Sequence, residues 1–163
     1  MTAEVADLTV VNLFQGVTEP GGATGAVDKA LDGAIRDVIA AGDFTGKAGE
    51  TALLYTRGAL PAARVLVVGL GEQEKFNLAA ARDAAATAAR KARELGVRTV
   101  ASVVHGAGAG GLEPQDAAQA VAEGTRLGLY RFAGHWSEPP KDRKPDPEAL
   151  TLVEFDAERL PAT

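Results

Sequence analysis

The stretch that most constrains the fold is Arg64–Gly71, with the sequence RVLVVGLG. Its apolar residues follow one another without alternation and are mainly β-branched valines, a pattern typical of a strand covered by helices on both faces. We therefore expect a central strand here. A segment with helical spacing follows at Leu78–Leu95, and a second apolar strand at Arg98–Val104. This order predicts a parallel βαβ unit.

The rest of the chain supplies elements that can surround this unit. Residues with high β-propensity predict three further strands, and apolar residues at helical spacing predict two further helices. The strands are expected at Leu8–Phe14, Thr51–Thr56 and Leu150–Phe155, and the helices at Ala26–Ala41 and Pro114–Phe132. The resulting order, β, α, β, β, α, β, α, β, is typical of a three-layer α/β/α sandwich with a mixed sheet.

The length of 163 residues predicts one domain spanning 1–163. Four prolines and the lack of an apolar anchor make residues 137–148 an expected exposed connection, with a last edge strand after it. Asn77 is the expected N-cap of the helix that begins at Leu78, and Gly96 is expected just beyond that helix's end.

Charge and cysteine content exclude several classes of function. The 17 basic and 22 acidic residues give a net charge of −5, which offers no electrostatic reason for bulk nucleic-acid binding. There is no cysteine, and therefore no disulfide or thiolate metal site. Neither a signal sequence nor an apolar run long enough to span a membrane is present. We expect a cytoplasmic protein with no membrane partner, and nucleic acid is an unlikely one.

Two loops carry candidate functional residues. In the stretch Asp43–Glu50, Phe44 is the expected anchor and two glycines make the turns, with Lys47 between them. Lys47 is expected to shape the loop or contact another domain, because nothing nearby supplies the burial that a catalytic lysine needs. The second loop, 105–111, leads from a strand to a helix, as phosphate-binding loops do. Its candidate ligand-binding residues are His105, Gly106, Gly108, Gly110 and Gly111. The alternative is a simple glycine-rich connection.

The sequence contains no constellation that could carry chemistry alone. Gly69-Leu70-Gly71 lacks the third glycine of a dinucleotide fingerprint, and Glu72 and Glu74 place negative charge where a pyrophosphate would lie. His105 and His135 are the only histidines and are expected to be ordinary loop residues that share no metal. We therefore expect no catalytic residue, no cofactor and no metal in this chain.

Three stretches together resemble the N-terminal domain of the M17 leucyl aminopeptidase family. They are DFTGKAGE at 43–50, RVLVVGLGEQEKF at 64–76 and AVAEGTRLGLYRF at 120–132. The resemblance implies a fold like that of the macro domain. It also implies that peptidase chemistry, with two divalent metals such as zinc or manganese, belongs to a separate C-terminal catalytic domain. Asp156 to Leu160 imitate part of that domain's motif but lack its preceding Asn-Thr and its glycine.

The resemblance implies that this chain is a non-catalytic domain that serves assembly or regulation of a leucyl aminopeptidase. It also implies a hexamer, the assembly that members of this family form. A stand-alone macro-like module that binds a nucleotide or ADP-ribose is the alternative. The sequence leaves open whether the chain is an excised domain or a natural short protein. Besides Lys47, the candidate interface residues are Leu129, Tyr130, Phe132 and Trp136, because a domain that packs on another should expose an apolar patch. The alternative is that these large side chains belong to the core.

Overall fold

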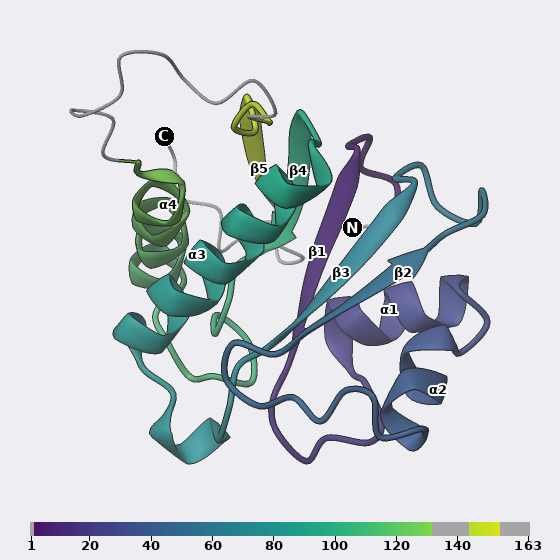
Figure 1. Ribbon diagram of the computed structural model, residues 1–163. Coiled ribbons are helices and arrows are strands. Elements are labelled where there is room, and N and C mark those ends of the chain that lie inside the picture. Colours follow the sequence, from purple (N-terminus) through teal and green to yellow (C-terminus); the bar gives the residue numbers. More distant parts are fainter. Residues whose placement is uncertain (1, 132–143, 154–163) are drawn as a thin grey trace.

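The structure, a computed structural model, describes residues 2–131 and 144–153. Features predicted at 132–143 and 154–163, including Phe132, Trp136 and the stretch from Asp156 to Leu160, lie outside the described residues. Within the described part, one sheet lies between two layers of helices (Figure 1). The strands are β1 (Leu8–Leu13), β2 (Thr51–Tyr55), β3 (Arg64–Gly69), β4 (Thr99–Val103) and β5 (Ala149–Val153). The helices are α1 (Gly22–Ala30), α2 (Ala34–Ala40), α3 (Leu78–Leu95), α4 (Pro114–Leu129) and the short 3-10 helix η1 (Gln73–Lys75).

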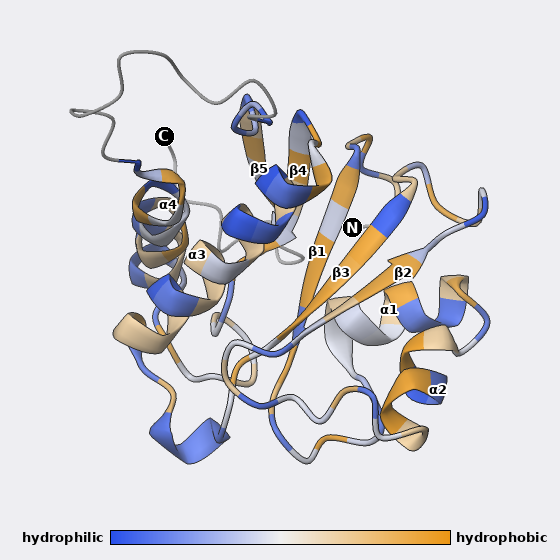
Figure 2. Cartoon of the chain, in the orientation of Figure 1, coloured by the Kyte–Doolittle hydropathy of each residue, from blue (hydrophilic) through white to orange (hydrophobic). Residues whose placement is uncertain are grey.

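The strand order β2-β3-β1-β4-β5 confirms the three-layer α/β/α sandwich with a mixed sheet. β1 is parallel to both β3 and β4, and β4 is parallel to β5, whereas β2 is antiparallel to β3. The prediction that Arg64–Gly71 forms the central strand is wrong by one position, because the crossover from β3 through α3 to β4 passes over β1. β1 is therefore the middle strand. Both β1 and β3 are apolar along most of their length (Figure 2).

One face of the sheet is covered by α3 and α4. Helix α3 buries a row of alanines, including Ala84, Ala88 and Ala92, against Leu66, Val68 and other sheet residues. Its predicted ends are confirmed: Asn77 Oδ1 accepts hydrogen bonds from the first-turn N–H groups of Ala79 and Ala80, and Gly96 adopts φ 69° after the last turn. Alanine has a high helix propensity and a short side chain, so another helix can pack close to the backbone of α3.

Helix α4 packs closely against the alanine-rich helix α3. A Cβ placed on Gly124 would overlap the backbone of Arg82, and one on Gly128 would lie 2.6 Å from Ala86 Cα. The small residues of α4 thus allow close approach of the two backbones. Because the two glycines allow α4 to lie against α3, most of the contacts of α4 are with α3 rather than with the sheet.

The opposite face is covered by α1 and α2, where one helix was predicted over Ala26–Ala41. The structure corrects this prediction, since the helix begins earlier and breaks between Ala30 and Ala34. Gly33 has φ 87°, and the buried Asp28 carboxylate accepts hydrogen bonds from Ile35 N at 2.9 Å and Arg36 N at 3.2 Å. Asp28 therefore caps the start of α2, and apolar spacing alone does not reveal such a break.

The last described segment runs along the far edge of the sheet. β5 is the predicted edge strand, within the expected stretch apart from its earlier start at Ala149. Of the expected exposed connection, 144–148 are described, and Asp146 there is half-buried. Its Oδ1 lies 3.4 Å from Arg93 Nη1 and 3.5 Å from Arg131 Nη2, which ties this segment to the ends of α3 and α4. Lys144, Pro145 and Glu148 are exposed, so the described part of the connection lies at the surface and is attached there through Asp146.

Candidate functional site

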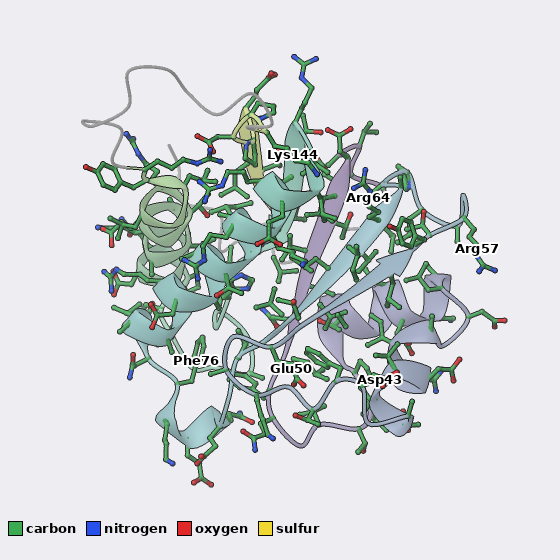
Figure 3. The ribbon with its side chains drawn as sticks, in the orientation of Figure 1. Asp43, Glu50, Arg57, Arg64, Phe76 and Lys144 are labelled. Atoms are coloured by element: carbon green, nitrogen blue, oxygen red, sulfur yellow. The ribbon has the colours of Figure 1, made fainter. Side chains whose placement is uncertain are left out.

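The loops that follow the parallel strands meet at the carboxyl edge of the sheet. In Figure 3, Asp43, Glu50 and Phe76 lie at this end of the molecule, whereas Arg64 and Lys144 lie at the opposite end. Gly16 N donates to Thr45 O at 3.2 Å and Gly71 N donates to Gly46 O at 2.9 Å. Because ligand sites of open α/β sheets lie outside the carboxyl ends of the strands, this edge is the first place to search.

The 43–50 loop is built as a rigid, closed unit. Phe44 is buried at 1% exposure, and Gly46 and Gly49 adopt φ values of 80° and 79°, as the sequence predicts. Glu50 Oε2 accepts hydrogen bonds from Thr45 N at 2.9 Å and Lys47 N at 3.1 Å. The N–H of Thr45 is the main cause that lowers the pKa of Glu50. The loop's own carboxylate thus occupies the backbone N–H groups that could otherwise bind an anion.

The Lys47 side chain takes no part in this hydrogen-bond network, which the residue joins through its backbone N–H and carbonyl oxygen. It is exposed and forms no ion pair with the described residues. Its position agrees with that of a loop-shaping or contact residue and offers no burial for a catalytic base.

An open cleft of about 800 Å³ lies beside the glycine-rich loop. Of the residues predicted there, Gly110 and Gly111 line the cleft, whereas His105, Gly106 and Gly108 do not. The other lining residues are Gln15, Gly16, Glu72, Gln73, Glu74 and Ala109. Gln73 Nε2 donates to Ala109 O at 2.6 Å, which holds the loop against η1. Glu72 and Glu74 therefore give the cleft the acidic character that the sequence predicts.

His105 begins the loop after β4, as the sequence predicts, but its environment is not that of an ordinary loop residue. Its side chain is fully buried, and Asn12 Nδ2 lies 2.9 Å from His105 Nδ1. Burial lowers the pKa of His105 to about 4, so the ring is neutral at physiological pH. Nε2 is buried and has no hydrogen-bond partner among the described residues. The only sequence signal for this pair is Asn12, the polar residue that interrupts an otherwise apolar strand.

The candidate interface residues divide at the end of α4. Tyr130 is 71% exposed, whereas Leu129 is only half-exposed. Leu127, which the sequence analysis did not select, is 68% exposed and lies one turn before Tyr130. Its helical spacing from Tyr130 was the signal that could have revealed it.

Three of the four basic residues of α3 are paired with acidic neighbours, and the fourth, Arg90, donates to Thr87 Oγ1. Arg82 Nε lies 2.6 Å from Glu123 Oε2, and Lys91 Nζ lies 3.0 Å from Glu94 Oε2. This helix therefore presents paired charges rather than a basic track for nucleic acid.

Metal ligands do not gather in the described part of the chain. Across residues 2–131 and 144–153, no group of three or more His, Asp or Glu side chains is placed to hold a metal ion. These residues therefore do not fit a two-metal centre, which needs several converging carboxylates. No helix in the same residues is long and apolar enough to cross a membrane.

Sequence comparison shows which protein family this chain resembles. The model of the cytosol aminopeptidase family, N-terminal domain, matches residues 10–139. The probable cytosol aminopeptidase of Roseiflexus castenholzii is 40% identical over 131 residues, which cover 80% of this chain and 26% of that protein. The probable cytosol aminopeptidase of Alkaliphilus metalliredigens is 32% identical over 140 residues, covering 86% of this chain and 28% of that protein.

Solved structures share the fold at lower sequence identity. A tomato leucine aminopeptidase mutant matches with a TM-score of 0.72 and 21% identity, over 94% of this chain and 30% of that one. A Trypanosoma brucei macrodomain in complex with ADP-ribose matches with a TM-score of 0.66 and 22% identity, over 94% of this chain and 60% of that one. The bottromycin maturation enzyme BotP in complex with Mn matches with a TM-score of 0.64 and 23% identity, over 95% of this chain and 28% of that one.

The sandwich and its carboxyl-edge cleft define a macrodomain-like α/β fold. Within that class, the chain belongs to the cytosol aminopeptidase family and corresponds to the family's N-terminal domain. It spans about a quarter of the length of the curated relatives that it matches.

Proposed function

We propose that this chain is the non-catalytic N-terminal domain of a leucyl aminopeptidase, a metal-dependent exopeptidase that removes N-terminal residues from peptides. The observation that carries the proposal is the match to the N-terminal domain of the family over residues 10–139. The relatives contain about three times as much chain outside the matched region as within it. In this proposal, catalysis and two divalent metals, zinc or manganese, belong to a C-terminal domain of a cytoplasmic enzyme.

The proposed role of this domain is to stabilise assembly of the parent enzyme and to regulate access to its catalytic domain. Leu127 and Tyr130 support this role, because these two large side chains, three positions apart at the end of α4, are exposed at 68% and 71%. We define them as the α4 patch. Its proposed partner is the catalytic domain of the same protein. The parent enzyme is proposed to be a homo-oligomer, and the family resemblance implies a hexamer. Lys47, on its rigid loop, is proposed as a second contact.

Sedimentation velocity of the isolated chain tests the α4 patch. An unpartnered apolar patch promotes self-association, so Leu127→Ser with Tyr130→Ser should shift the chain toward monomer and leave the melting temperature nearly unchanged. Tyr55→Ser is the matched control, since Tyr55 is 67% exposed on β2 at the other edge of the sheet. A drop of several degrees in melting temperature without a change in sedimentation would assign the patch to the core and overturn its proposed role.

A nucleotide or ADP-ribose ligand is the second candidate function. The cleft of about 800 Å³ at the carboxyl edge, lined by Gly110 and Gly111, is the observation in its favour. Glu72 and Glu74 line the same cleft and oppose it, because carboxylates repel phosphate, although Lys75 Nζ, 2.8 Å from Glu72 Oε2, offsets part of the charge of Glu72. We therefore propose that such ligands bind weakly or not at all.

Calorimetric titration with ADP-ribose and ATP separates the two candidates. A low-micromolar dissociation constant that is lost in Gly110→Val would favour the binding module. Gly108→Val is the matched control, because a Cβ at Gly108 meets no atom within 4 Å, whereas one at Gly110 would lie 2.6 Å from Gly106 Cα. Equal loss in both variants would indicate disruption of the whole loop rather than of the cleft.

A further inference from the structure

A cavity of about 200 Å³ lies between α4 and the sheet, apart from the carboxyl-edge cleft. The sheet contributes Val10, Val100 and Ser102 to its wall, α3 contributes short alanines, and α4 contributes Val121 and Thr125. The packing described above explains why this space is open. Gly124 and Gly128 hold α4 against the backbone of α3, and alanine side chains are too short to fill the volume beneath.

His105 lines this cavity and brings an unsatisfied polar atom to it. His105 is a wall residue of the cavity, whereas Asn12, which contacts Nδ1, is not, so Nε2 lies on the side of the ring away from Asn12. Because the Asn12 amide N–H donates to Nδ1, the neutral ring carries its proton on Nε2. A buried N–H without an acceptor destabilises a protein, because the group loses its hydrogen bond to water and gains none in return. An unpaired Nε2–H therefore destabilises the folded chain unless a hydrogen-bond acceptor enters the cavity.

The other wall residues restrict which kind of molecule can supply this hydrogen-bond acceptor. Ser102 Oγ donates to Val103 O at 3.0 Å and Thr125 Oγ1 donates to Val121 O at 2.8 Å, so both hydroxyl protons are engaged. A single water would meet few of the two to four polar partners that buried water requires. The two charged wall residues, Arg126 and Glu148, are exposed, so an anion beside His105 would lie buried against a neutral imidazole and apolar side chains, which disfavours it. The volume exceeds the roughly 150 Å³ of cavities that hold benzene.

We propose that this cavity binds a small, neutral and mostly apolar molecule whose carbonyl-type oxygen accepts a hydrogen bond from His105 Nε2–H. The molecule enters between the end of α4 and the start of β5, where Arg126, Leu129 and Pro147 form the rim. This site is separate from the α4 patch and the carboxyl-edge cleft, and it does not depend on the proposed aminopeptidase function.

The test uses the full chain with His135→Gln, which leaves His105 as the single histidine for ¹⁵N NMR. Cyclohexanone is the probe, and methylenecyclohexane is a probe of the same shape without a hydrogen-bond acceptor. We expect cyclohexanone to shift the His105 Nε2 resonance and the methyl resonances of Val10, Val100 and Val121 in a saturable manner. Methylenecyclohexane should bind at least several-fold more weakly and leave Nε2 nearly unshifted.

Val121→Phe fills the cavity and should abolish these shifts, whereas Leu127→Ala, exposed on the same helix, should retain them. If the spectrum of Val121→Phe shows an unfolded chain, Ala89→Leu, which fills the same cavity from α3, replaces it. The proposal is overturned if cyclohexanone shifts neither Nε2 nor the three valines. It is also overturned if both probes shift them equally, or if the shifts survive in the folded cavity-filling variant.

Discussion

The two faces of the sheet are filled in different ways. On the α1/α2 face, the large side chains Val27, Ile35 and Phe44 reach the sheet and are at most 1% exposed. On the α3/α4 face, alanines meet the sheet, the two helices approach each other through glycines, and a cavity with a buried histidine remains. Small residues thus allow two helices to pack closely together, but they leave the space between helix and sheet less completely filled.

The largest effect is expected on the filled face. Phe44→Ala should lower the free energy of unfolding by about 3–5 kcal/mol, because it removes a fully buried aromatic side chain and leaves a cavity. Ala88→Gly, a truncation on the other face, should cost only about 1 kcal/mol through helix propensity. Urea unfolding followed by circular dichroism measures both. Equal losses would contradict the contrast between the two faces.

Acid should destabilise the α3/α4 face through His105. Its pKa of about 4 in the folded chain lies below the ordinary 6.5, so the unfolded chain takes up the proton first as pH falls. The stability of wild type relative to His105→Gln should therefore be unchanged above pH 6.5 and fall by up to about 3 kcal/mol toward pH 4. Urea unfolding at several pH values measures this difference. His135→Gln is the control, and a pH-independent difference for His105→Gln would show that the folded ring titrates normally.

The contact between the helices gives the smallest of the three effects. Gly124→Val should destabilise the chain by about 1–3 kcal/mol, because its side chain must push α4 away from the backbone of Arg82. Gly108→Val, where a Cβ meets no atom within 4 Å, should change stability by less than about 0.5 kcal/mol. Thermal unfolding is sufficient to compare them. Equal stability of both variants would mean that α4 is not held closely.

Features set by local chemistry could be predicted from the sequence. The N-cap at Asn77, the end of α3 at Gly96 and the turns around Phe44 follow from residues close to one another in the chain. The order of strands could not be predicted in the same way, because pairing of β1 with β3 joins residues more than fifty positions apart. The break before α2 was missed since Asp28 caps it from the preceding helix.

The candidate sites follow the same division. Gly110 and Gly111 reach the cleft as loop residues after a strand should, and Tyr130 is exposed as expected for an interface. His105 was misjudged because its environment is made by Asn12, which is distant in sequence, and by helices α3 and α4. Only the tertiary structure reveals that the glycine-rich loop begins with a buried imidazole.

The measurement that tests the functional account most directly is hydrolysis of leucine p-nitroanilide by the purified chain with added zinc, manganese or magnesium. We expect no turnover above the metal-only blank, because in the proposed function the ligands of a two-metal peptidase belong to another domain. Metal-dependent turnover abolished by Asp156→Ala with Glu158→Ala would show that this chain carries a catalytic metal site after all. Turnover that survives this pair of substitutions would place a site elsewhere in the chain and contradict the account equally.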